Sequence, residues 1–210
     1  MWADLVDKVN GLRQGRVSKL VARRMREFNG IGRKGNEEWF SELCFCILTA
    51  NSTARRGMKI QRELGSKGFL TLPLDDLRRR LKAAGHRFPD TRARFIVEAR
   101  KIRDLKKITK KFENPKQARE WLVRNVKGIG HKEASHFLRN VGFDGVAILD
   151  RHVLSVLREH GLIDEVPRSL IRGRYLGIEE KLEGLARRLG LSLGELDLYL
   201  WYMKTGEILK

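Results

Sequence analysis

The stretch VKGIGHKEAS, residues 126–135, interrupts helix-forming sequence with two glycines and places a lysine just after them. Gly128 and Gly130 flank one isoleucine, and His131 and Lys132 follow. A tight turn of this kind leaves backbone N–H groups unpaired at the positive end of the next helix, where they can bind an anion. We expect both glycines to be required, because a positive φ and a close backbone approach exclude a Cβ. The stretch predicts a helix–hairpin–helix, although an ordinary corner between two helices fits the same letters.

The charge of the chain indicates which anion this turn would bind. The 210 residues include 44 Lys and Arg against 26 Asp and Glu, a net charge of +18. Residues 100–139 alone hold 13 Lys and Arg against 4 Asp and Glu. Such a surplus favours a nucleic-acid partner, since a solubilising surface mixes both signs. Lys127, Gly128, Gly130 and His131 are therefore candidates for binding DNA phosphates.

Helical periodicity extends over nearly the whole chain. Apolar residues recur at spacings of three and four, alternating patterns are scarce, and only 4 residues are Pro. We expect an all-α fold of about ten helices. Its predicted organisation is two small helical domains that flank a cleft, one formed by residues 36–136 and ending in the helix–hairpin–helix, the other by residues 1–35 plus 137–210. No apolar run approaches a membrane span or the core of a signal peptide, so we expect an intracellular protein.

The metal-binding residue types are few and poorly spaced. Cys44 and Cys46 lie in the apolar stretch SELCFCILTA, where positions i and i+2 of a helix point to different sides. We expect buried thiols there rather than a disulfide. Two cysteines cannot hold an iron–sulfur cluster of the four-cysteine kind, and the 5 histidines lack zinc spacing. We predict no metal, no cofactor and no iron–sulfur cluster.

Lys132 and Asp150 are the candidate catalytic residues. Lys132 lies nearly opposite the apolar stripe of its helix, which by itself describes a solvated lysine. Asp150 follows 18 residues later and by itself would make a good N-cap for RHVLSVLREH. Neither residue carries a catalytic interpretation alone.

Together these residues resemble a known signature. The segments VKGIGHKEAS and GVAILDRHV are similar to the helix–hairpin–helix–GPD superfamily of DNA glycosylases, whose bifunctional members have a lysine after the hairpin and an aspartate about 18 residues on. ILTANSTA, HRFPDTRARFI and the ending WYMKTGEILK resemble the compact type 2 8-oxoguanine DNA glycosylase/AP lyase found mainly in archaea. The likeness covers about residues 36–210.

The resemblance implies a bifunctional enzyme of base-excision repair. It would flip 8-oxoguanine out of double-stranded DNA, and Lys132 would attack C1′ to give a Schiff base, followed by β-elimination 3′ to the lesion. The amine must be unprotonated to attack, and we expect a half-buried, cationic neighbourhood around it. Asp150 would stabilise positive charge on the sugar and assist proton transfer.

The resemblance also implies a base pocket. Phe88 and Trp201 match aromatic positions of the type 2 group, although each is also explained as a core aromatic. The terminal Lys210 would place its free carboxylate at the base, where an acceptor is needed for the N7–H of 8-oxoguanine. Asn51 lies where the superfamily has a polar residue facing the DNA.

Two other interpretations remain open on the sequence. The chain could be a non-enzymatic helix–hairpin–helix module that binds DNA for a larger assembly, or a related glycosylase for another oxidised base. The enzyme itself is expected to be a monomer acting in the cytoplasm on the nucleoid of a prokaryotic cell.

Overall fold

The computed structural model describes residues 2–210, which form twelve α-helices and no strand. The all-α prediction is confirmed. The helices are α1 (Ala3–Arg13), α2 (Arg16–Arg33), α3 (Asn36–Thr49), α4 (Ala54–Thr71), α5 (Leu74–Ala83), α6 (Pro89–Ala99), α7 (Leu105–Lys110), α8 (Pro115–Asn125), α9 (His131–Asn140), α10 (Arg151–Glu159), α11 (Arg172–Leu189) and α12 (Leu193–Thr205).

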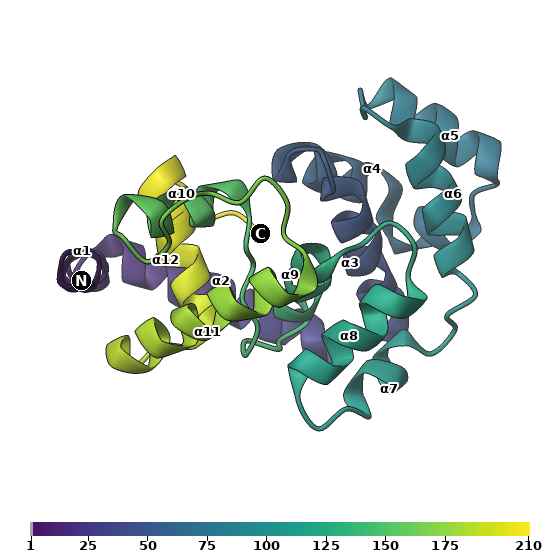
Figure 1. Cartoon of the computed structure of the whole chain (residues 1–210). Helices are drawn as coiled ribbons and strands as arrows, with labels where there is room; N and C mark the ends of the chain where they lie inside the picture. The colour runs from purple at the N-terminus through teal and green to yellow at the C-terminus, as the bar shows by residue number, and fades with distance from the viewer. Residues whose placement is uncertain (1) are drawn as a thin grey trace.

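Buried apolar side chains form two clusters, which correspond to the two sides of the molecule in Figure 1. The first cluster draws its members from residues 39–146, between α3 and the loop after α9. The second combines residues 5–28 of α1 and α2 with residues 147–200 of α10 to α12. The clusters thus divide after Val146, whereas the predicted domain division at residue 136 falls inside α9.

Two buried ion pairs tie the clusters together. Arg119 of α8 donates through Nη1 and Nη2 to the two carboxylate oxygens of Glu179 on α11, at 2.5 and 2.7 Å. Arg139 of α9 pairs with Asp197 of α12. Such pairs contribute little net stability but enforce one geometry, since breaking either would leave a buried charge uncompensated. The first core is therefore held at a fixed position against the second.

Helix α3 contributes most of the centre of the first core. Every residue from Trp39 to Thr49 is buried, including the free thiols of Cys44 and Cys46. Burial raises the pKa of both thiols well above the usual value, so they are inert apolar groups as expected.

No helix within residues 2–210 combines the length and the apolar character that crossing a membrane requires. Over the same residues, the structure contains no cluster of three or more His, Cys, Asp or Glu side chains suited to a metal ion.

Candidate active site

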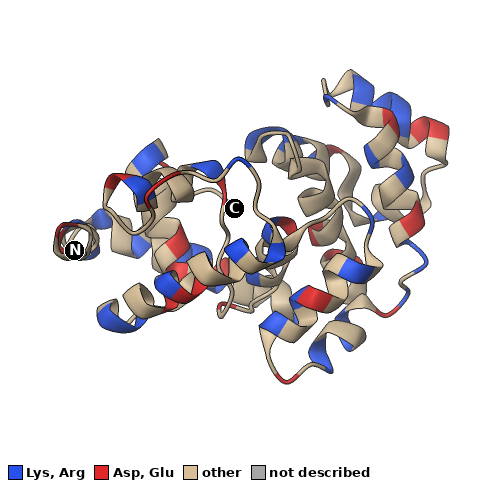
Figure 2. Ribbon diagram, in the orientation of Figure 1, with Lys and Arg blue, Asp and Glu red and all other residues tan. Residues whose placement is uncertain are grey.

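A cleft with a volume of about 1070 Å³ opens between the two cores. Its walls come from the turn between α3 and α4, from α9, from the start of α10, from the loop before α11, and from α12 with the C-terminal tail. Cationic residues outnumber acidic ones in this lining, eight to four. Figure 2 shows that Lys and Arg also cover helices on both sides of the molecule. The cleft is therefore suited to a polyanion.

The hairpin before α9 depends on one glycine rather than two. Gly128 has a φ of +87°, and a Cβ on it would lie 2.2 Å from Cδ2 of Phe95. Gly130 has a φ of −105° and is the N-cap of α9, and the nearest neighbour of a Cβ added to it would be Oε2 of Glu133 at 3.5 Å. The expectation that both glycines need a positive φ is thus wrong for Gly130. Its N–H donates to Oε2 of Glu133 at 3.1 Å, which is the one half of a capping box that a glycine N-cap can form.

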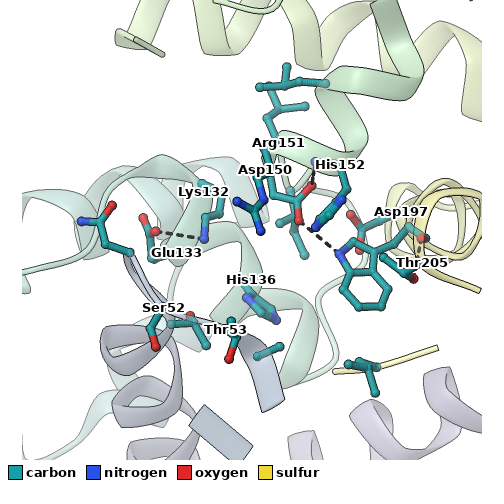
Figure 3. Close-up of a pocket in the computed structure, with 18 of the residues that line it drawn as sticks. Ser52, Thr53, Lys132, Glu133, His136, Asp150, Arg151, His152, Asp197 and Thr205 are labelled. Atoms are coloured by element: carbon teal, nitrogen blue, oxygen red, sulfur yellow. Dashed lines mark hydrogen bonds and ion pairs between the residues drawn. The ribbon is translucent and has the colours of Figure 1, made fainter. Parts of the chain in front are cut away.

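Lys132 reaches into the cleft from the first turn of α9 (Figure 3). Its side chain is 27% exposed, and Nζ lies 3.0 Å from Oε1 of Glu133. Burial alone would raise the pKa of Glu133, but Lys132 and the Gly130 N–H outweigh it and lower that pKa. The direct partner of Lys132 is therefore an acid, within a cleft whose charged lining is mainly cationic.

Asp150 lines the same cleft as Lys132 and is held on both carboxylate oxygens. Oδ1 accepts the N–H groups of His152 and Val153, both at 2.8 Å, which makes Asp150 the N-cap of α10. Oδ2 accepts the indole N–H of Trp201 at 3.1 Å (Figure 3). The two candidate catalytic residues thus meet in one hollow although they belong to different helices.

The three residues predicted for the base pocket have different surroundings. Trp201 lines the cleft and meets the His152 ring edge-on, with centroids 5.8 Å apart. Lys210 also lines the cleft, and its Nζ donates to Oε1 of Glu42 at 2.5 Å and to Oε1 of Gln61 at 2.6 Å. Phe88, at the N-cap of α6, is 38% exposed and does not line the cleft.

The predicted DNA-binding residues Lys127, His131 and Asn51 lie in three different surroundings. Lys127 is exposed, with Nζ 2.9 Å from Oε1 of Glu98. His131 faces away from the cleft lining: its Nε2 lies 3.1 Å from Oε1 of Glu120, and its ring packs 5.4 Å from that of Tyr175. Asn51 is exposed at the rim of the cleft with a φ of +59°.

Arg92 connects the Asn51 turn to the hairpin. Its buried guanidinium donates to the carbonyl of Ala50 at 2.8 Å and to the carbonyl of Gly128 at 3.3 Å. Two loops far apart in the sequence are thereby held at fixed positions beside the cleft.

Sequence reasoning missed a buried polar chain behind the cleft. Arg139 contacts Asp197 and donates to the side-chain oxygen of Asn140, and Asn140 donates to Oε2 of Glu42 at 3.1 Å. Glu42 in turn binds Lys210. Burial raises the pKa of Asp197 to about 7, although Arg139 opposes the shift. The available signal was a carboxylate within the apolar stretch of each of two helices, Glu42 in α3 and Asp197 in α12.

His136 is a second missed residue, one turn beyond Lys132 on α9. It lines the cleft and packs edge-on against Phe45, with ring centroids 5.4 Å apart. Burial and the nearby cations lower its pKa well below the usual value, so the imidazole is neutral at physiological pH.

Comparison with known proteins places this geometry in a family. The family model Ogg-HhH, described as 8-oxoguanine DNA glycosylase, matches residues 21–191. A protein of Methanocaldococcus jannaschii named 8-oxoguanine DNA glycosylase/AP lyase is 53% identical, over 98% of this chain and 99% of its own length. One of Korarchaeum cryptofilum with the same name is 52% identical, over 99% and 98%.

Solved structures of similar proteins also match the fold of this chain. The crystal structure of the Methanocaldococcus jannaschii 8-oxoguanine glycosylase/lyase in complex with a 15mer DNA containing 8-oxoguanine matches with a TM-score of 0.95 and 53% identity, covering 98% of this chain and 99% of that one. The 8-oxoguanine DNA glycosylase of Thermotoga maritima matches with a TM-score of 0.93 and 47% identity, over 100% of both chains. The chain therefore belongs to the 8-oxoguanine DNA glycosylase family.

Proposed function

We propose that the chain is a bifunctional DNA glycosylase/AP lyase that excises 8-oxoguanine from double-stranded DNA. The observation that carries the proposal is the meeting of Lys132 and Asp150 in one cationic cleft between two helical cores. Membership of the family, at more than half identity to relatives named for this activity, supports the substrate. A module that only binds DNA has no need of a half-buried carboxylate that shares a hollow with a lysine.

The proposed chemistry starts once the damaged nucleotide has been flipped into the cleft. Lys132 gives its proton to solvent and leaves its ion pair with Glu133, and the free amine attacks C1′. The new bond between Nζ and C1′ forms as the bond from C1′ to N9 breaks, and the base departs with that electron pair. Asp150 stabilises the positive charge that develops on the sugar.

The lyase step follows from the same adduct. The sugar ring opens to a Schiff base between Lys132 and C1′, which acidifies the proton on C2′. Transfer of that proton to solvent forms a double bond between C2′ and C3′, and the bond between C3′ and its oxygen breaks. The phosphate leaves with that electron pair, which cuts the strand 3′ to the lesion. Hydrolysis of the remaining Schiff base releases the enzyme.

Recognition of the base is assigned to the cleft around Trp201 and Lys210. Guanine has a lone pair at N7, whereas 8-oxoguanine has an N–H there, so a selective pocket needs an acceptor. The ammonium of Lys210 can only donate, and it is bound to Glu42 and Gln61, so the backbone oxygen of this residue is the part of it that can accept. Phe88 lies outside this cleft and is better suited to contact the DNA at its rim.

The DNA backbone is assigned to the hairpin with Gly128, Gly130 and the exposed Lys127, and to Asn51, whose turn Arg92 holds beside the hairpin. His131 contributes by fixing the start of α9 against Glu120. We expect a monomer that acts on nucleoid DNA in the cytoplasm.

The proposal is tested with duplexes that contain one 8-oxoguanine, one oxidised pyrimidine or no lesion. Borohydride should trap the wild-type protein covalently on 8-oxoguanine DNA and hardly at all on the others. Lys132→Gln should abolish both trapping and strand cleavage while DNA affinity stays within a few-fold.

Lys127→Gln is the matched control, because it removes one cation of the hairpin without touching the cleft. It should weaken binding modestly and leave trapping intact. A Lys132→Gln protein that still cleaves 8-oxoguanine DNA would contradict the assignment. A preference for the oxidised pyrimidine would change the substrate but keep the chemistry.

A further inference from the structure

We propose that Trp201 acts as a positioning residue for Asp150, by holding the carboxylate oxygen that does not cap α10. The inference rests on the proposed function and adds to it a role for Trp201 other than stacking on the base. Its basis is the hydrogen bond from the indole N–H to Oδ2 at 3.1 Å.

The two oxygens of Asp150 are supported differently. Oδ1 has two backbone donors, the N–H groups of His152 and Val153, which are fixed by the first turn of α10. Oδ2 has one donor among the described residues, and that donor is Trp201. Without it, the carboxylate can rotate about its last side-chain bond while one oxygen still caps the helix. The N-cap therefore fixes where Asp150 is, and Trp201 fixes which way its free oxygen points.

Trp201 is itself held by α12. Asp197, one turn earlier on that helix, pairs with Arg139 two turns beyond Lys132 on α9. Figure 3 shows Asp197 on the same side of the cleft as Asp150. A continuous set of contacts therefore runs from the helix that carries the lysine, through α12, to the free oxygen of Asp150.

This arrangement joins the two groups that must act on one sugar. Catalysis requires the carboxylate to be aligned before charge develops, because a group that must reorient in the transition state gives up most of its benefit. A hydrogen bond to a charged group is stronger than one between neutral groups, so the bond from Trp201 can hold the carboxylate in one orientation. Trp201 is thus expected to contribute to every step that uses Asp150, whether or not a base is present.

The test separates positioning from stacking by using two substrates. Trp201→Phe keeps an aromatic face and removes the N–H. Single-turnover rates are measured on 8-oxoguanine DNA and on DNA with a preformed abasic site, together with the affinity for each. Positioning predicts that both rates fall by roughly 10- to 100-fold while both affinities change little. Stacking, which the Phe ring largely retains, predicts at most a small loss, and on 8-oxoguanine DNA alone.

A second variant guards against a packing defect in the first. Site-specific replacement of Trp201 by 3-benzothienylalanine keeps the bicyclic shape and substitutes sulfur for the N–H. It should reproduce the loss on both substrates. Trp121→Phe, in a half-buried Trp of α8 that packs on Phe112 outside the cleft, should leave both rates near those of the wild type. Full activity of the benzothienyl protein, or a loss confined to one substrate, would overturn the proposal.

An NMR measurement reports on the contact without any activity. The indole N–H of Trp201 should exchange slowly with solvent, and its resonance should move on Asp150→Asn substitution while that of Trp121 stays in place. A wild-type protein that is inactive on both substrates would refute the proposed function. A rapidly exchanging Trp201 N–H that ignores the Asp150 substitution would refute the positioning role.

Discussion

Gly128→Ala is expected to destabilise the protein severely, for two separable reasons. Gly128 has a φ of +87°, where a side chain adds roughly 1–2 kcal/mol of backbone strain. Its new Cβ would also lie 2.2 Å from Cδ2 of Phe95, and forcing a packed ring aside costs about 1–3 kcal/mol. We therefore expect a loss of about 2–5 kcal/mol in the free energy of unfolding, by urea denaturation followed by circular dichroism.

Gly130→Ala is the matched control, two residues away in the same hairpin. Its φ is −105° and its Cβ would contact only the end of the Glu133 side chain at 3.5 Å. Alanine is merely a poorer N-cap than glycine, so the loss should stay within about 1 kcal/mol. Equal losses in the two variants, or a Gly128→Ala protein within about 0.5 kcal/mol of the wild type by the same assay, would refute the reasoning.

Three further predictions concern the buried polar groups. Asp197→Leu should cost roughly 3–5 kcal/mol in urea denaturation because it strands the charge of Arg139, and adding Arg139→Met should recover most of that loss; a double variant as unstable as the single one would contradict this. The folded state lowers the pKa of His136. As the pH drops below about 6.5, the imidazole therefore binds a proton in the unfolded chain but stays neutral in the folded one. The contribution of His136 to stability should then fall by up to about 1.4 kcal/mol per pH unit, whereas Asp197, with its pKa raised to about 7, contributes in the opposite direction. The free energy of unfolding of His136→Phe relative to that of the wild type should therefore rise as the pH is lowered from 7.5 to 5.5; a constant difference would show that the imidazole is not the group. Glu42→Gln should loosen the seat of Lys210 and slow base excision by roughly tenfold, with less effect on a preformed abasic site; equal slowing of both rates would argue that Lys210 does not serve the base.

Local sequence patterns were enough to predict the helices and the positions of Lys132 and Asp150 on them. Asp150 caps α10 because its side chain, backbone position and following apolar pattern all favour an N-cap. Lys132 follows the hairpin within one turn, so its helix and approximate direction were predictable from spacing. The two glycines of GIG, in contrast, look identical in sequence, and only the fold shows that Gly128 alone adopts a positive φ.

Contacts between distant segments were not predictable. Arg139 and Asp197 are 58 residues apart, and Glu42 and Lys210 are 168 apart. A charged residue within the apolar stretch of a helix, such as Glu42 or Asp197, indicates a buried partner. It does not identify that partner, because the way the helices pack decides which residues pair. The surroundings of Phe88 were also not predictable: the base pocket stays a prediction for its ring, which lies at the N-cap of α6 and is not among the residues that line the cleft.

The central claim is that the Nζ of Lys132 bonds to the sugar. The direct measurement is peptide mapping of the adduct formed when borohydride reduces the complex with 8-oxoguanine DNA. Trypsin should fail to cut after the modified lysine, so the nucleotide remnant should appear on the peptide GIGHKEASHFLR, residues 128–139. A remnant on Lys210, on another lysine or on the N-terminal amine, with residues 128–132 released unmodified, would contradict the account.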